Sequence, residues 1–269
     1  MTAKTIYLDT FALVKISTDP ILMSASAEYI RANSYTLIIG IMNLMEIYGW
    51  RKRWPQVSEF ISSVPFCIAE NPEKITAREI ENYPNKIDLP VAFCSSDYAF
   101  SQLELQNAIE LNLEEKIASF EKKYRAQYKE TLDSILSGRD DNLPDEHGKY
   151  SDQSRWVYMQ INVLKFLFPD YKAFVDEKRA KSEFIQIECI KSAYLQALII
   201  FQEYYVQRKA GKLSDIGDIY QLAIIPYIDL AVIDNERNDL VQRINRNGLF
   251  PAKLNACNLS QFKKIVTAK

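Results

Sequence analysis

The chain has 269 residues, of which 48% are hydrophobic and 25% charged, and it contains only seven glycines. This composition excludes a disordered or collagen-like chain and is typical of a globular protein with many helices. The formal net charge of −2 and the pI near 5.7 exclude a generally basic surface, so any binding of nucleic acid must use a local basic patch.

Several kinds of site and location are excluded by what the sequence lacks. His147 is the only histidine and lies in a polar stretch, so a site that needs two histidines is excluded. No signal-peptide core and no run of about 18 apolar residues occurs, which predicts a cytoplasmic protein without a membrane partner. The cysteines are scattered without a CxxC pair, so we expect them to be reduced: Cys67, Cys94, Cys189 and Cys257.

The first part of the chain alternates β-prone runs with helical patterns. TIYLDT, at residues 5–10, predicts a strand with Asp9 at its carboxyl end, and a helix over 20–33 follows with Pro20 at its start. YTLIIG at 35–40 predicts a buried strand, and IMNLMEIYGWRKR after it predicts a helix that carries Glu46. PFCIA at 65–69 predicts a third strand, and residues 71–83 predict a helix capped by Asn71.

Residues 95–208 have a different character, because long amphipathic helical patterns dominate them. The patterns cover residues 101–136, 154–168 and 171–209. The only evident loop between them is SGRDDNLPDEHGKY, at residues 137–150. We therefore predict an all-helical insertion at 95–208.

The last part of the chain returns to alternation. A helix that begins near Ser214 or Asp215 precedes a strand in YIDLAVI at 227–233, a helix over 235–245, a strand in 252–258 and a helix over 259–266. Without the insertion, strands and helices alternate along the chain, which predicts an α/β fold with an open parallel sheet and right-handed crossovers. The predicted domains are residues 1–94 with 209–269, interrupted by the helical insertion.

Four carboxylates lie at strand ends or helix starts of this predicted sheet: Asp9, Glu46, Asp218 and Asp234. Carboxylates that converge on one edge repel one another and raise each other's pKa unless a cation neutralises them. Oxygen ligands without histidine or cysteine favour Mg²⁺ or Mn²⁺. The alternatives are ordinary ones: Asp234 as a helix cap, Glu46 on a solvated helix face, and Asp215 as the cap of the helix that carries Asp218.

Such a centre suits hydrolysis of phosphodiester bonds. A divalent cation lowers the pKa of a bound water that attacks phosphorus, and a second cation can stabilise the leaving oxygen. This chemistry needs no histidine as a base, so the single histidine of the chain is no obstacle.

The motifs that carry these acids are IYLDT, MNLMEIYG, SDIGDIYQLAIIPYID and AVIDNERN, and in this order they resemble the PIN-domain family of metal-dependent nucleases. The resemblance covers about residues 1–94 and 209–269. It implies a PIN-like fold and an endoribonuclease in which Asp9, Glu46, Asp218 and Asp234 hold the metal. It also implies RNA as substrate and, as for the toxins of the family, an antitoxin or another protein partner. Many relatives have a histidine where this chain has Gln221.

Other residues are candidates for substrate binding. Arg51, Arg53 and Arg237 flank the acidic motifs and are positioned to attract a phosphate backbone, although solvation of a helix face also explains such arginines. Tyr48, Trp50 and Trp54 are candidates to stack on a base, although aromatic residues at this spacing often form core.

Two alternatives to a ribonuclease stay open: a non-catalytic PIN-like scaffold that binds proteins, and a nuclease that cleaves DNA, single-stranded DNA included. An oligomer is compatible with each of the three.

Overall fold

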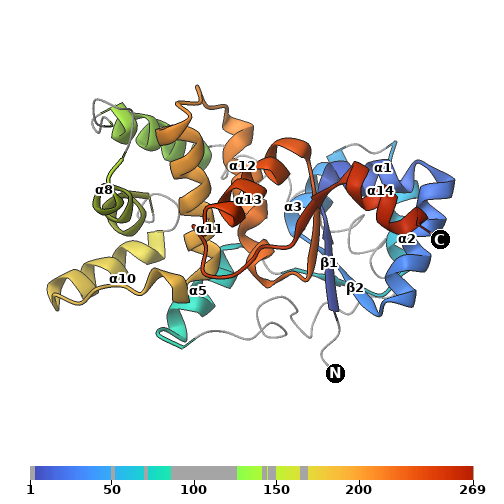
Figure 1. The fold of residues 1–269 in the computed structure, drawn as a ribbon, viewed down its shortest axis with the longest axis horizontal. Coiled ribbons are helices and arrows are strands. Elements are labelled where there is room, and N and C mark those ends of the chain that lie inside the picture. The colour runs from blue at the N-terminus through green and yellow to red at the C-terminus, as the bar shows by residue number, and fades with distance from the viewer. Residues whose placement is uncertain are drawn as a thin grey trace. The chain divides into compact units, whose positions relative to one another are not determined.

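The computed structural model describes residues 4–49, 52–69, 72–85, 126–140, 144, 150–163 and 169–268. The chain divides into two compact units (Figure 1). Among the described residues, 4–69 and 224–268 form the first, here called the sheet unit. Residues 72–85 and 126–223 form the second, here called the helical unit.

The sheet unit contains five parallel strands in the order β3-β2-β1-β4-β5. Their bounds are β1 Lys4–Leu8, β2 Tyr35–Ile39, β3 Phe66–Ile68, β4 Leu230–Ile233 and β5 Ala256–Asn258. Strand β1 is central and almost fully buried, as a parallel sheet covered by helices on its faces requires. The predicted α/β class and the open parallel sheet are confirmed.

Helices follow the strands with almost no connecting residues, and polar side chains cap them. Asp9 caps α1 (Thr10–Ser17), Asp234 caps α13 (Asn235–Arg246), and Asn258 caps α14 (Leu259–Thr267). The remaining helices of the unit are α2 Pro20–Ala32, α3 Ile41–Gly49 and α4 Trp54–Ser62, and η5 Leu222–Tyr227 leads into it. Because three caps come directly after strands, they all lie at the carboxyl edge of the sheet.

At the opposite edge, Thr5 and Asp229 join the starts of the two central strands. The Oδ2 atom of Asp229 accepts hydrogen bonds from the Thr5 backbone N–H at 2.7 Å and from the Thr5 hydroxyl at 3.0 Å. The Asp229 N–H donates to Thr5 Oγ1 at 3.1 Å in return. Asp229 therefore has a structural role, because it joins the start of β4 to the start of β1.

The helical unit has no strand in its described residues. It contains a helix over residues 126–140 and, in chain order, α5 Pro72–Glu81, α8 Asp152–Val157, η2 Tyr158–Val163, α10 Pro169–Ala180, η3 Ile187–Cys189, α11 Lys191–Ile200, η4 Phe201–Val206 and α12 Leu213–Gln221. Both η2 and η4 are π-helical continuations of the helix before them. Nowhere in the described part of the chain is a helix long and apolar enough to cross a membrane.

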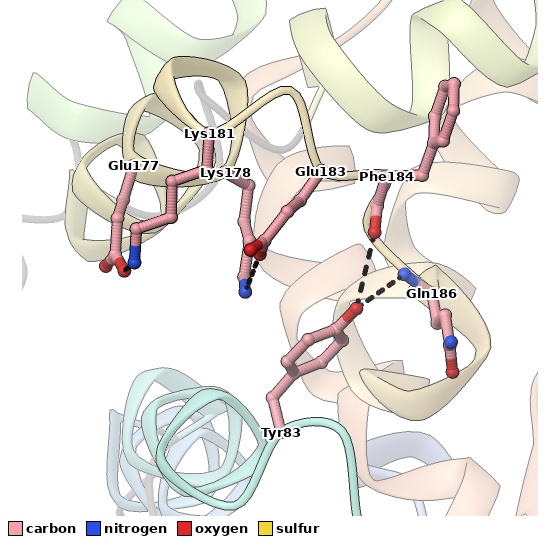
Figure 2. A network of polar contacts seen from close by, with 7 residues as sticks. All are labelled: Tyr83, Glu177, Lys178, Lys181, Glu183, Phe184 and Gln186. Atoms are coloured by element: carbon pink, nitrogen blue, oxygen red, sulfur yellow. Dashed lines mark hydrogen bonds and ion pairs between the residues drawn. The ribbon is translucent and has the colours of Figure 1, made fainter.

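The helical pattern predicted over 171–209 is wrong between residues 181 and 190, where the chain leaves α10 before it enters α11. Ser182 adopts a left-handed conformation with φ of 54°. The Tyr83 hydroxyl accepts from Gln186 N at 3.0 Å and donates to the Phe184 carbonyl at 3.5 Å (Figure 2). Lys178 and Glu183 pair across the turn at 2.5 Å. A tertiary contact from Tyr83 thus holds a break that no proline or glycine announces in the sequence.

The contacts group α5 and α12 with the helical unit, although the sequence pattern placed both with the sheet. Part of the predicted insertion, with its boundary at residue 94, lies outside the described residues. The predicted division at residues 94 and 208 stays a prediction.

The cysteines differ in part from expectation. Cys67, in β3, is disulfide-bonded, so the prediction of a reduced thiol is wrong there. Cys189 and Cys257 are free and buried. Burial raises the pKa of the Cys257 thiol to about 11, which keeps it protonated and unreactive at neutral pH.

Candidate metal centre at the carboxyl edge of the sheet

The strand order reverses between β1 and β4. Strand β1 pairs with β2 on one side and with β4 on the other, and the chain leaves β1 toward β2. In open α/β sheets, ligands bind outside the carboxyl ends of strands where the order reverses in this way. Asp9 directly follows β1 and Asp234 directly follows β4, so the fold brings these two predicted residues to one position.

Both aspartates are also helix caps, so the two interpretations of the sequence are compatible. Asp9 Oδ1 accepts from Ala12 N at 2.6 Å, and Asp234 Oδ1 accepts from Arg237 N at 3.0 Å. The Asp9 N–H donates to the Val232 carbonyl at 3.0 Å, which ties the end of β1 to β4. Each cap uses Oδ1, so it fixes the direction of the carboxylate.

The surroundings of Asp9 raise its pKa from 3.8 to about 7. Burial of the carboxyl is the largest cause, and the negative charges of Asp234 and Glu46 raise it further. Hydrogen bonds from the backbone N–H groups of Ala12 and Asp234 oppose this and lower the pKa. Three of the four predicted acids are therefore electrostatic neighbours, and a cation would relieve their repulsion.

Glu46 reaches this edge through a hydrogen-bond network that the sequence reasoning missed. The Thr10 hydroxyl donates to Glu46 Oε2, and Asn43 Nδ2 donates to Thr10 Oγ1 at 3.0 Å. The Gly40 N–H donates in turn to Asn43 Oδ1 at 3.0 Å. Asn43 is fully buried, whereas Glu46 is exposed, so a buried amide holds a surface carboxylate through Thr10.

The position of Gly40 is also explained by this network. A Cβ atom at residue 40 would lie 2.7 Å from Asn43 Oδ1, closer than packed atoms approach. A larger residue at position 40 would displace the Asn43 amide that lies against the backbone there. Two signals in the sequence could have revealed the network: Asn43 and Glu46 are one turn apart on a helix, and Thr10 directly follows Asp9.

The fourth predicted acid, Asp218, lies on α12 in the helical unit and is partly exposed, as is Gln221 on the same helix. Its membership of the metal centre stays a prediction. Asp215 is a structural residue, because its Oδ2 accepts from Lys212 N at 2.9 Å at the start of α12. The prediction that Asp215 is the N-cap is wrong, because the N-cap is Lys212 and Asp215 lies in the first turn of the helix, where its carboxylate accepts from the backbone N–H of the N-cap. Asp239 is exposed on α13, as expected for a solvated residue.

The basic and aromatic candidates have different environments. Arg53 is exposed directly before α4, whereas Arg237 is only 4% exposed. Trp54 is 8% exposed and packs in the core of the sheet unit, which favours the core interpretation over base stacking. Arg51, Trp50 and His147 lie outside the described residues.

The residues at the edge fit a hydrated hard cation better than an all-protein cage. No three or more acidic, histidine or cysteine side chains of the described chain are grouped closely enough to hold a metal ion. Mg²⁺, however, usually keeps several waters and takes only one or two protein carboxylates together with substrate phosphates. Neither Asp9 nor Asp234 forms an ion pair with another described residue, so their charges are not balanced by the protein there.

Comparison with known proteins adds nothing to this geometry. No family model matches the chain, and no curated protein or solved structure matches it. The parallel α/β sheet and the acidic edge are therefore the observations on which a functional conclusion depends.

Proposed function

We propose that the protein is a PIN-like endoribonuclease that uses Mg²⁺ or Mn²⁺ to hydrolyse phosphodiester bonds. Asp9 and Asp234 hold a hydrated cation at the carboxyl edge of the sheet, Glu46 takes part through the waters of the cation, and the sequence motif adds Asp218. One observation carries the proposal: Asp9 and Asp234 end adjacent parallel strands where the strand order reverses, with Glu46 as an electrostatic neighbour. RNA as the substrate comes from the resemblance of the motifs.

The residues of the chain position the reacting groups. A divalent cation at this edge would supply a water of lowered pKa and polarise the phosphate. The two helix caps orient the Asp9 and Asp234 carboxylates before any ligand arrives. Thr10 and Asn43 orient Glu46, which limits the number of side-chain conformations that binding must restrict.

The proposal is tested by incubating the full chain with labelled single-stranded RNA and with DNA of the same sequence, in Mn²⁺, Mg²⁺ or EDTA. We expect RNA cleavage that needs the cation and that Asp234→Asn abolishes, while the matched variant Asp239→Asn retains it. Asparagine caps helices as well as aspartate does, so Asp234→Asn keeps the start of α13. Full activity in both Asp9→Asn and Asp234→Asn contradicts the proposal, and cleavage of DNA alone makes the protein a DNA nuclease.

The lack of a three-acid group among the described residues favours a second candidate, a non-catalytic scaffold of the same fold. A calorimetric titration with Mn²⁺ separates the two. Binding in the millimolar range or tighter that Asp9→Asn weakens supports the nuclease. The absence of Mn²⁺ binding together with the absence of cleavage supports the scaffold.

A further inference from the structure

One aromatic side chain at the carboxyl edge is exposed although its neighbours are buried. Phe11 is 50% exposed in the first turn of α1, between the buried residues Thr10 and Ala12. Only Thr10 separates it from Asp9, so the two Cα atoms lie within about 7.6 Å, twice the spacing of consecutive Cα atoms. Side chains on a helix tilt toward its N-terminus, which directs the Phe11 ring toward the acidic edge.

A single exposed phenylalanine is common on protein surfaces, so its exposure alone indicates no site. Here a cation accompanies it. Lys15 lies one turn further along α1, and its Nζ atom is 5.7 Å from the centroid of the Phe11 ring. Lys15 is exposed and forms no ion pair with the described residues. Helix α1 thus carries Asp9 at its cap, a flat apolar ring in its first turn and an ammonium group beside this ring.

This combination matches the parts of a single-stranded nucleic acid. Proteins bind unpaired bases by stacking them on aromatic rings and bind the adjacent phosphates with basic side chains. The exposed large hydrophobic residues described in the sheet unit are Phe11, Ile21 and Ile265, and only Phe11 has a ring that can stack. Trp54, the described tryptophan of the same unit, is buried.

We propose that Phe11 stacks on an unpaired base of the substrate, next to the bond that is cut, and that Lys15 contacts a neighbouring phosphate. The inference rests on the proposed nuclease function and narrows its substrate to single-stranded RNA. A base inside a duplex has both faces covered by its neighbours and cannot stack on Phe11.

Binding is measured in the Asp9→Asn background, in which the RNA stays intact, by fluorescence anisotropy of a labelled 12-nucleotide RNA. We expect Phe11→Ala to weaken binding about 5- to 100-fold, the range found when one base loses its stacking partner. Phe11→Tyr restores the affinity because tyrosine keeps the ring. Ile21→Ala, which removes an exposed apolar side chain beyond the far end of α1, leaves it unchanged.

Two further measurements separate stacking from general binding. In the first, each nucleotide of the RNA is replaced in turn by an abasic one. We expect one position at which the loss of affinity equals that caused by Phe11→Ala, and no further loss of affinity when this RNA is combined with the Phe11→Ala protein. Lys15→Gln lowers the slope of log affinity against log salt by about one. The Asp9→Asn protein binds duplex RNA of the same sequence more weakly than the single strand. When Phe11→Ala is added, the protein binds duplex and single strand equally.

The inference is overturned if Phe11→Ala binds the single strand as well as its parent, if duplex binds as tightly, or if no RNA binds. Its failure is distinguishable from that of the nuclease. If cleavage depends on the cation and Phe11→Ala leaves the KM unchanged, only the stacking role of Phe11 is contradicted. If RNA binding depends on Phe11 but no RNA is cleaved in Mn²⁺, the nuclease function is contradicted and the RNA-binding role of Phe11 is supported.

Discussion

Acidic side chains satisfy helix N-termini in both units of the molecule, yet their neighbours differ. In the helical unit, Glu79 accepts from Ser192 N at the start of α11, and Asp215 accepts from Lys212 N. In the sheet unit, Asp9 and Asp234 make the same kind of hydrogen bond. Capping by itself therefore does not separate a structural acid from a functional one.

The charge around each carboxylate distinguishes the structural acids from the candidate functional ones. Lys209 Nζ lies 3.6 Å from both Asp215 Oδ2 and Glu203 Oε1, so the helical unit supplies its own cation. At the sheet edge, the groups that face Asp9 include Asp234 and Glu46, and negative charge accumulates. An acid whose charge the protein balances is structural, whereas the acids that are left unbalanced together are the ones that we propose to hold a cation.

The largest expected effect comes from removing one charge in each unit. Asp9→Asn lowers the rate of Mn²⁺-dependent RNA cleavage by on the order of a thousandfold, because a bound cation contributes several kcal/mol to such a reaction. Asp215→Asn, the matched change in the helical unit, leaves the rate per folded molecule unchanged. The cleavage rate of each variant is measured under single-turnover conditions and corrected for the fraction of folded protein. Equal losses of rate in the two variants would contradict the distinction between the two kinds of acid.

The effects of changing Asp215 and Asp234 on stability should be the reverse of their effects on activity. Asp215→Ala lowers the free energy of unfolding by about 2–3 kcal/mol, because it leaves the Lys212 N–H without its partner beside a half-buried Lys209. Asp234→Asn keeps its cap and changes the stability by less than about 0.5 kcal/mol. Urea unfolding of each variant gives these values, and a large loss in Asp234→Asn would make its role structural.

The raised pKa of Asp9 predicts a pH dependence with a definite sign. Between about pH 4 and pH 7 the folded protein keeps a proton on Asp9 that the unfolded chain has released, so metal-free stability falls as pH rises through this window. Asp9→Asn lacks this fall and is more stable than the parent by up to about 4 kcal/mol at pH 8, with no difference near pH 4. Parallel pH profiles of urea unfolding would contradict the prediction.

The smallest expected effect concerns the network that orients Glu46. Thr10→Val removes the hydroxyl that donates to Glu46 without changing the size of the side chain, and we expect Mn²⁺ affinity to fall about tenfold. Thr10→Ser keeps the hydroxyl and the affinity. Calorimetry in the absence of RNA makes the comparison, and equal affinities for the two variants would show that Glu46 does not need Thr10.

Much of the sheet unit is predictable from the sequence because its signals are local. Apolar runs that end in an aspartate, followed at once by a helix pattern, predicted β1 with Asp9 and β4 with Asp234. The break between α10 and α11 was not predictable, because Tyr83 imposes it from about 100 residues away. The segment itself contains strong helix formers and neither glycine nor proline.

The candidate site shows the same limit. Asp9 and Asp234 follow strands, so their meeting depends only on strand order. The bond between Thr10 and Glu46 joins two helices 36 residues apart, and no single-residue preference encodes it. The double use of Asp234 as cap and candidate ligand was also missed, because the two roles were treated as rivals, and no capping role was predicted for Asp9.

The central position of β1 has a consequence for the order in which the protein forms. Its partner β2 ends at Ile39, but its other partner, β4, ends only at Ile233, after the helical unit. At a synthesis rate of about 5–20 residues per second, roughly 10–40 s pass between the two. The helical unit can leave the ribosome and fold while the first half of the sheet still waits for Asp229 to reach Thr5. A nascent chain therefore cannot bring Asp9 and Asp234 together at the sheet edge until β4 has been made.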